Sequence, residues 1–291
     1  AMGAIIAVIG LELAPVAANM AGLTGDKIDM VNVAISMFTL AVGVIGSVAF
    51  RGFMSIIPIL FGVVCGYVFA AIMGIVNFQP VIDAPWFQVP HFYAPVFDIN
   101  AIMIIAPAAL VVLAEHIGHL VVTGNIVDRD LIKDPGLSRS LFADGLSNVI
   151  SGFAGATPNT TYGENIGVMA ITKVYSTWVI GGAAVMAIIL SFCGKLSELI
   201  HSIPVPVMGG ICILLFGVIA ASGIRVLVER QVDYSKSSNL VMTSVIMIIG
   251  LSGAKLSFGA FSVQGMVLAT VVAIIMSLAF KLFEYLHLLN E

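Results

Sequence analysis

Apolar runs long enough to cross a lipid bilayer recur along almost the whole chain. A membrane-spanning helix needs about 20 mostly apolar residues. Of the 291 residues, 60% are hydrophobic and only 10% are charged. A water-soluble fold of this size could not bury so much apolar surface, so we expect an all-α polytopic membrane protein. The predicted spans, about ten in number, cover residues 1–23, 29–50, 53–77, 101–124, 138–157, 161–173, 174–194, 204–224, 237–254 and 262–285.

Several kinds of site are excluded by what the sequence lacks. Cys65, Cys193 and Cys212 lie in apolar runs without CxxC spacing, so we expect neither a disulfide framework nor a metal site. No phosphate-binding loop, dinucleotide fingerprint or hydrolase motif occurs in the sequence. We therefore expect no enzyme activity, no bound cofactor and no nucleic-acid partner.

The basic residues indicate how the spans are oriented. If the chain starts on the cytoplasmic side, Lys27, Lys195 and Lys255 lie outside, and the other nine Lys and Arg residues lie inside. Cytoplasmic loops of membrane proteins carry such an excess of positive charge. The loop 78–100 has no Lys or Arg and is rich in Pro and aromatic residues, so we expect it on the extracytoplasmic side.

Two parts of the sequence resemble each other at a nearly constant offset. Met2-Gly3-Ala4-Ile5 recurs as Met208-Gly209-Gly210-Ile211, and the pair Asn32 and Gly43 recurs as Asn239 and Gly250. Seven predicted spans separate the copies, so the second copy has the opposite membrane orientation, as in the inverted repeats of secondary transporters. A complete repeat would place four more spans, about 100 residues, before Ala1 and give fourteen spans in two sets of seven.

Glu115 is one of three carboxylates, with Glu12 and Glu164, that stand out within the predicted spans. A charged side chain in a span costs about 2.5–3.5 kcal/mol on the insertion scale, so its presence indicates a structural or functional role. Glu115 and His119 are four residues apart and share one helix face, whereas His116 points elsewhere. Burial favours the protonated form of a carboxyl group. We therefore interpret Glu115 and His119 as a proton-binding pair, with a structural Glu–His pair as the alternative.

Glu164 follows a predicted break in a span. Residues 158–163, Pro-Asn-Thr-Thr-Tyr-Gly, are too polar and too rich in Pro, Gly and β-branched residues for a continuous helix. Irregular backbone at this depth survives only where protein or a cavity surrounds it. We predict an extended segment followed by a half-helix starting near Gly163, whose free N–H groups lie beside the Glu164 carboxylate. This site suits a ligand with both C=O and N–H groups; the alternative is a break that only eases packing.

Glu12 is the last of these three carboxylates to be considered. It lies in the first span, in a part of the repeat that has no break. We therefore expect a structural or gating role for Glu12 rather than contact with a substrate.

Residues 164–173, with the sequence ENIGVMAITK, resemble the signature of the nucleobase–ascorbate transporter family, also called nucleobase–cation symporters. That signature reads Gln/Glu/Pro-Asn-x-Gly, four residues, Thr, then Arg/Lys/Gly. The segments 114–119 (AEHIGH) and 160–163 (TTYG) strengthen the likeness, which extends over all 291 residues. Glu at the first signature position is similar to the uracil branch of the family rather than to the purine and xanthine branch.

The resemblance implies a domain organisation. The family has seven-plus-seven spans, with four spans of each repeat in a core domain and three in a gate domain. The first half of the core, with its own broken span, has no counterpart in this sequence. The implied parts are a first gate part of three spans at 1–77, an extracytoplasmic loop at 78–100, the second half of the core with four spans at 101–194 and a break near 158–164, and a second gate part of three spans at 195–291.

The resemblance also implies roles for individual residues. The substrate-binding positions match Glu115, Tyr162, Gly163 and Glu164, and the proton-coupling positions match Glu115 and His119. The signature also contains three supporting residues, Asn165, Gly167 and Thr172.

The expected function is proton-coupled uptake of uracil across the bacterial cytoplasmic (inner) membrane. The alternatives are a purine or xanthine permease of the same family, an anion exchanger of the same architecture and a non-transporting fragment. The expected partners are uracil or a related nucleobase and the lipid bilayer, and the sequence leaves a homodimer open.

Overall fold

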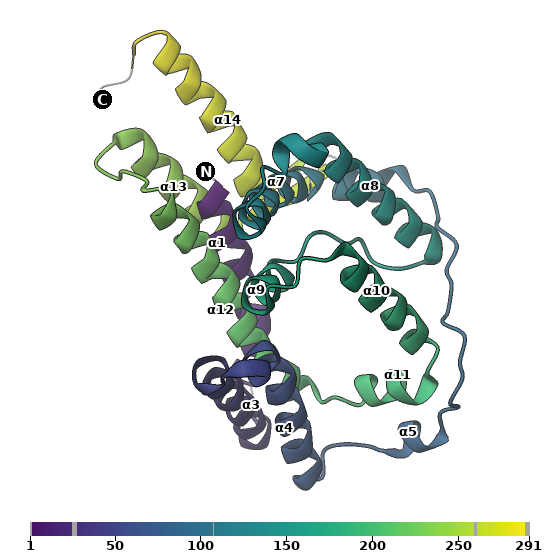
Figure 1. Ribbon diagram of the computed structural model, residues 1–291. Helices are drawn as coiled ribbons and strands as arrows, with labels where there is room; N and C mark the ends of the chain where they lie inside the picture. Colours follow the sequence, from purple (N-terminus) through teal and green to yellow (C-terminus); the bar gives the residue numbers. More distant parts are fainter. Residues whose placement is uncertain (1, 25–27, 107, 259–260, 289–291) are drawn as a thin grey trace.

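The computed structural model describes residues 2–24, 28–106, 108–258 and 261–288, and most of them are helical. Figure 1 shows helices from the two ends of the chain in one column, with the middle of the chain arching away from it. The helices are α1 (Met2–Glu12), α2 (Ala14–Met20), α3 (Met30–Ala49), η1 (Gly52–Ile56), α4 (Pro58–Ile72), α5 (Gln79–Asp83), α6 (Ile99–Ile105), α7 (Ala108–Val127), η2 (Ile132–Gly136), α8 (Leu137–Ala154), α9 (Gly163–Thr172), α10 (Thr177–Ser191), α11 (Gly194–His201), α12 (Val205–Glu229), α13 (Ser237–Leu251) and α14 (Gly265–Tyr285).

Several of these helices are suited to cross a membrane. Within the described ranges, length and apolar composition select four segments: Met2–Met20, Met30–Ala49, Val205–Glu229 and Gly265–Tyr285. The pair α10 and α11 passes the same test as one unit but bends by 88° at its junction. The polytopic helical character is therefore confirmed, while the number of ten spans stays a prediction.

The first span contains one residue, Leu13, that belongs to neither α1 nor α2. Helix α1 ends at Glu12 and α2 begins at Ala14, with Pro15 in the first turn of α2. Proline has no amide N–H to donate to the carbonyl of the preceding turn, so the helix is interrupted there. Glu12 is therefore the last residue of α1.

Helices from the two ends of the chain pack closely through small residues. A Cβ added at Gly3 of α1 would lie 2.8 Å from the carbonyl oxygen of Gly223 on α12. A Cβ at Gly223 would in turn meet the backbone of Ala7. Such small residues let helix backbones approach in a membrane, where no hydrophobic effect drives helices together. Helix α12 also contacts α2, α3 and α4, so one bundle joins residues 2–72 to residues 205–229.

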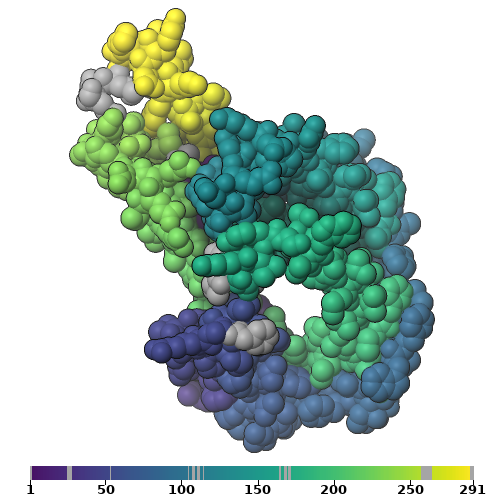
Figure 2. Space-filling view, viewed as in Figure 1, coloured from purple at the N-terminus to yellow at the C-terminus, as the bar shows by residue number. Residues whose placement is uncertain are grey.

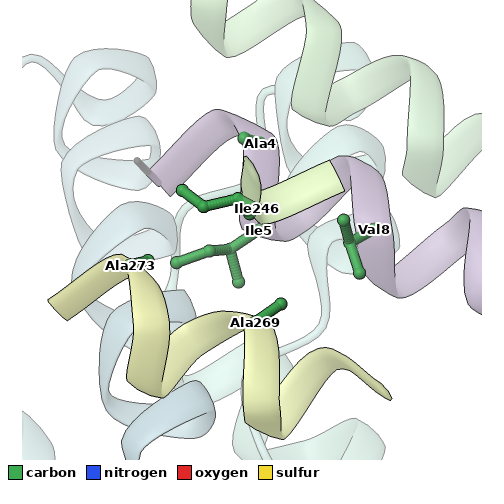
Figure 3. Close-up of a cluster of buried hydrophobic side chains, with 6 residues drawn as sticks. All are labelled: Ala4, Ile5, Val8, Ile246, Ala269 and Ala273. Carbon is green, nitrogen blue, oxygen red and sulfur yellow. The ribbon is translucent and has the colours of Figure 1, made fainter. Parts of the chain in front are cut away.

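An apolar cluster joins α1 to the last two helices (Figure 3). Its members are all at most 6% exposed and come from α1, α13 and α14. They are Ala4, Ile5, Val8, Ile246, Ala269 and Ala273. Because three of the six are alanines, the helices approach closely, and α13 and α14 become part of the same bundle as α1 and α12.

The connection after α4 is anchored on the junction between α10 and α11. The Lys195 ammonium donates hydrogen bonds to the carbonyl oxygens of Val81 (3.1 Å) and Ile82 (2.9 Å) in α5. The rings of Phe87 and Phe192 stack with centroids 5.9 Å apart. The predicted loop 78–100 is thus partly helical and docked. Figure 2 shows an opening bordered by α4, α10 and α11.

A short hairpin precedes the last helix. Strands β1 (Lys255–Phe258) and β2 (Phe261–Gln264) are antiparallel, with Lys255 opposite Gln264. This hairpin is an exception to the all-α expectation, and it moves the start of the last helix from the predicted residue 262 to Gly265. Strand β2 contacts α6 and the start of α14.

Because α1 and α12 lie so close together, we expect alanine to change the stability of the protein in opposite directions at two glycines of α12. Gly223→Ala should destabilise the bundle by about 1–3 kcal/mol, because the new methyl group overlaps the α1 backbone. Gly217→Ala is the matched control, since a Cβ there has no neighbour within 4 Å, and alanine is a better helix former than glycine. Denaturation in detergent should show a lower free energy of unfolding for Gly223→Ala alone. Equal stability of the two variants would contradict the close packing of α1 on α12.

Candidate functional site

The chain leaves the helical conformation between α8 and α9, and side chains of α8 hold the extended segment 156–162. The amide N–H of Asn159 donates to Oδ1 of Asn148 (2.8 Å), and Nδ2 of Asn148 donates to the carbonyl oxygen of Asn159 (2.9 Å). The Asn159 side chain accepts from Ser147 Oγ (2.8 Å) and donates to Ser151 Oγ (3.0 Å). The Asn148 amide thus binds Asn159 as a neighbouring strand would.

Helix α9 starts directly after this segment. Tyr162 has extended backbone angles and its side chain makes no capping hydrogen bond, and the helix begins at Gly163. This is the position where the sequence predicts a half-helix to start. The first N–H groups of a helix have no partner within the helix, and they carry the positive end of its dipole. The Tyr162 side chain does not satisfy these N–H groups.

Helix α7 brings His119 to this break. Nδ1 of His119 lies 2.9 Å from the hydroxyl oxygen of Thr161, the residue two positions before α9. A Cβ added at Gly163 would lie 3.3 Å from Nε2 of the same ring. The imidazole therefore lies against both the extended segment and the first residue of α9.

Glu115 lies one turn before His119 on α7 and is partly buried. Successive residues of an α-helix are turned by about 100°, so Glu115 lies between the directions of His119 and Gly118. His119 faces the break before α9, and a Cβ at Gly118 would lie 3.0 Å from Sδ of Met2 in α1. Glu115 therefore occupies the sector of α7 between the break and α1.

The other predicted site residues lie at or in α9, and they differ in how much of their surroundings the structure describes. Tyr162 is 62% exposed, and Gly163 and Asn165 are also exposed. Thr172 is partly buried in the last turn of α9. Glu164 and Gly167 lie in α9, and the Glu164 side chain is outside the described part of the structure.

Sequence reasoning missed two polar contacts that shape the site. His116 is 3% exposed, and its Nε2 lies 2.7 Å from Ser140 Oγ, which links α7 to α8. Glu12 accepts a hydrogen bond from the amide N–H of Met266, at the start of α14. The sequence shows an unexplained acidic residue in a span for Glu12, but it contains no signal for either partner.

Comparison with known proteins identifies the family. A profile described as the Permease family matches residues 1–259. The chain belongs to this permease family. It is 64% identical to "Uracil permease" of Escherichia coli (strain K12) over 290 residues, which are 99% of this chain and 68% of the relative. It is 60% identical to "Uracil permease" of Paenibacillus larvae subsp. larvae over 297 residues (100% and 70%), and 46% identical to "Uracil permease" of Bacillus subtilis (strain 168) over 290 residues (95% and 67%).

Family membership decides the broad class of activity. The permease is a transporter and not an enzyme. With its apolar helices and bacterial relatives, it is a multi-pass protein of the cytoplasmic (inner) membrane. Within the described residues, no group of three His, Cys, Asp or Glu side chains is arranged to hold a metal ion.

The Asn148–Asn159 pair predicts a stability effect at the break. Asn148→Ala leaves the Asn159 N–H and C=O groups without their partner, and each partly buried group left unsatisfied costs about 1–3 kcal/mol. The free energy of unfolding in detergent should fall by about this amount. Asn239→Ala is the control, because it removes one exposed hydrogen bond to Asp233 and should change stability by less than about 0.5 kcal/mol. Equal losses in the two variants would show that Asn148 does not hold the segment.

Proposed function

We propose that the permease takes up uracil across the cytoplasmic membrane together with protons. The observation that supports the substrate is the name of three relatives, "Uracil permease", at 64%, 60% and 46% identity over nearly the whole chain. The observation that supports proton coupling is the pair Glu115 and His119 on one face of α7, directly beside a break in the helical backbone.

We propose the domain arrangement implied by the family resemblance. Residues 1–77 and 195–291 form a gate domain, 78–100 form an extracytoplasmic loop, and 101–194 form the second half of a core domain in a seven-plus-seven inverted repeat. The contacts support this division, because α1–α4 pack on α12 and α1 also packs on α13 and α14. Helix α7 contacts both α8 and α9. The exposed apolar side chains of helices such as α10, including Trp178, contact lipid in this arrangement.

In this proposal, uracil binds at the start of α9. The ring has C=O acceptors and N–H donors on its edge. The backbone N–H groups near Tyr162 and Gly163 donate to a carbonyl, and Glu164 accepts from a ring N–H. Glu115 contacts a second polar edge from α7. Asn165, Gly167 and Thr172 support the half-helix that presents these donors.

Glu115 is the proposed proton carrier, and His119 adjusts its proton affinity. Protonation of Glu115 removes a charge from the sector between the break and α1. An uncharged carboxyl group costs less to move past an apolar surface, so protonation lowers the barrier to sliding of the core against the gate. His119 contacts Thr161 next to the substrate position, so substrate and proton affect each other through this contact.

Uptake of radiolabelled uracil tests the proposed function. Cells that express the complete natural gene for this chain should accumulate uracil faster at acidic than at neutral external pH. An excess of unlabelled uracil should abolish the uptake, and the same excess of xanthine should leave it intact. Absence of uptake, or equal competition by xanthine, would overturn the proposed substrate.

Glu115→Gln tests proton coupling. The amide keeps polar contacts but cannot carry a proton, so uptake driven by a pH gradient should fall about tenfold or more, a change that corresponds to about 1.4 kcal/mol. Exchange of labelled for unlabelled uracil, which needs no net proton movement, should fall less. Glu229→Gln is the control, because its pairing with Arg225 is exposed and contributes little. Glu115→Gln with intact pH-dependent uptake would refute the role of Glu115.

A further inference from the structure

Glu12 joins two helices that lie at opposite ends of the chain. Its Oε2 accepts a hydrogen bond of 2.7 Å from the amide N–H of Met266, 254 residues away, and the contact is partly buried. Glu12 is the last residue of α1, and Met266 is the second residue of α14. A carboxylate at a helix N-terminus is favourable because it meets free N–H groups and the positive end of the dipole.

The start of α14 depends on this remote carboxylate. Gln264, which precedes the helix, makes no side-chain capping hydrogen bond. Gly265 has a φ of +56°, which favours glycine, and a Cβ at this position would overlap the carboxylate of Glu12. Glycine at 265 therefore lets the Glu12 side chain reach the amide of Met266. The contact is partly buried, and a hydrogen bond shielded from water is electrostatically stronger than an exposed one.

The helices that Glu12 joins both contact α7. Near the other end of α1, Met2 lies close to Gly118 of α7. Helix α14 packs against α7 as well, and β2, directly before α14, contacts α6. The surface that faces the helix of Glu115 and His119 is thus made by α1 and α14 together. Its shape depends on how α14 is held relative to α1.

We propose that Glu12 is a positioning residue for transport. Its carboxylate fixes the start of α14 on α1, and the two helices together form the gate surface along which α7 moves. This role rests on the proposed function of uracil transport. The geometry requires an acceptor oxygen at Glu12 and not a transferable proton, so the side chain acts on the rate of the conformational change without touching the substrate.

The first test compares two substitutions at Glu12 in the complete natural protein. Glu12→Gln keeps an acceptor oxygen, and it should retain at least about half of the maximal uptake rate with an unchanged pH profile. Glu12→Leu removes the acceptor and should lower the maximal rate about tenfold or more, as expected for a misplaced helix. The affinity for uracil, measured by binding in detergent, should stay within about threefold in both variants.

The contradicting results are distinct. If the maximal uptake rate of Glu12→Leu is within twofold of the wild-type rate, the contact is unimportant for transport. If Glu12→Gln loses uptake as fully as Glu12→Leu, or shifts the pH profile, Glu12 carries a proton and does not position α14. A loss of uracil affinity in Glu12→Leu equal to its loss of rate would also overturn the positioning role.

Two glycines supply a matched pair that leaves Glu12 unchanged. Gly265→Ala places a methyl group where the carboxylate lies and should reproduce the rate loss of Glu12→Leu. Gly253→Ala is the control, because Gly253 also has a positive φ (+68°) but has open space around a Cβ. Equal effects of the two substitutions would attribute the loss to backbone strain and contradict the proposal.

Hydrogen exchange separates this inference from the proposed function. Peptides that contain Met266 should exchange faster in Glu12→Leu than in wild type or Glu12→Gln, whatever substrate the protein carries. If wild type takes up no uracil but this exchange pattern is seen, the proposed substrate is wrong and the contact stands. If wild type takes up uracil but exchange at Met266 is the same in all three proteins, the contact does not exist and the positioning role fails.

Discussion

The fold depends on hydrogen bonds that replace water wherever the backbone is irregular inside a membrane. A regular helix satisfies its own N–H and C=O groups, whereas an extended segment or a helix start needs outside partners. Asn148 supplies two such bonds to Asn159 in the segment before α9. Glu12 supplies one to Met266 at the start of α14. In both places a side chain from another helix does what solvent does in a soluble protein.

Helix α7 contacts the break before α9 on one side and helices α1 and α14 on the other. His119 contacts Thr161 beside the start of α9, His116 contacts Ser140 on α8, and Gly118 lies against Met2 of α1. Glu115 falls between the directions of the break and α1. Under the proposed function, a change in its protonation state acts on both the proposed substrate region and the surface shared with the proposed gate domain. This placement gives a physical reason for a carboxylate at this position of an otherwise apolar helix.

The sequence predicts those features that depend on neighbouring residues. The run 158–163 predicts the start of α9 at Gly163, and the spacing of Glu115 and His119 places them on one face of α7. The features it misses depend on distant partners. No local pattern links Glu12 to Met266. Strands β1 and β2 are short and lie between apolar helices, and the polar helix α11 follows an 88° bend at the end of the predicted span 174–194. The Glu164 carboxylate lies outside the described side chains, so its role rests on the family signature.

The central claim is that proton movement drives uracil uptake, and reconstitution of the complete purified protein into liposomes tests it most directly. Liposomes with an alkaline interior and an acidic exterior should accumulate labelled uracil above the external concentration. The accumulated uracil should leave when a protonophore removes the gradient. Equilibration to the external concentration alone, with no effect of the pH gradient or the protonophore, would contradict the account.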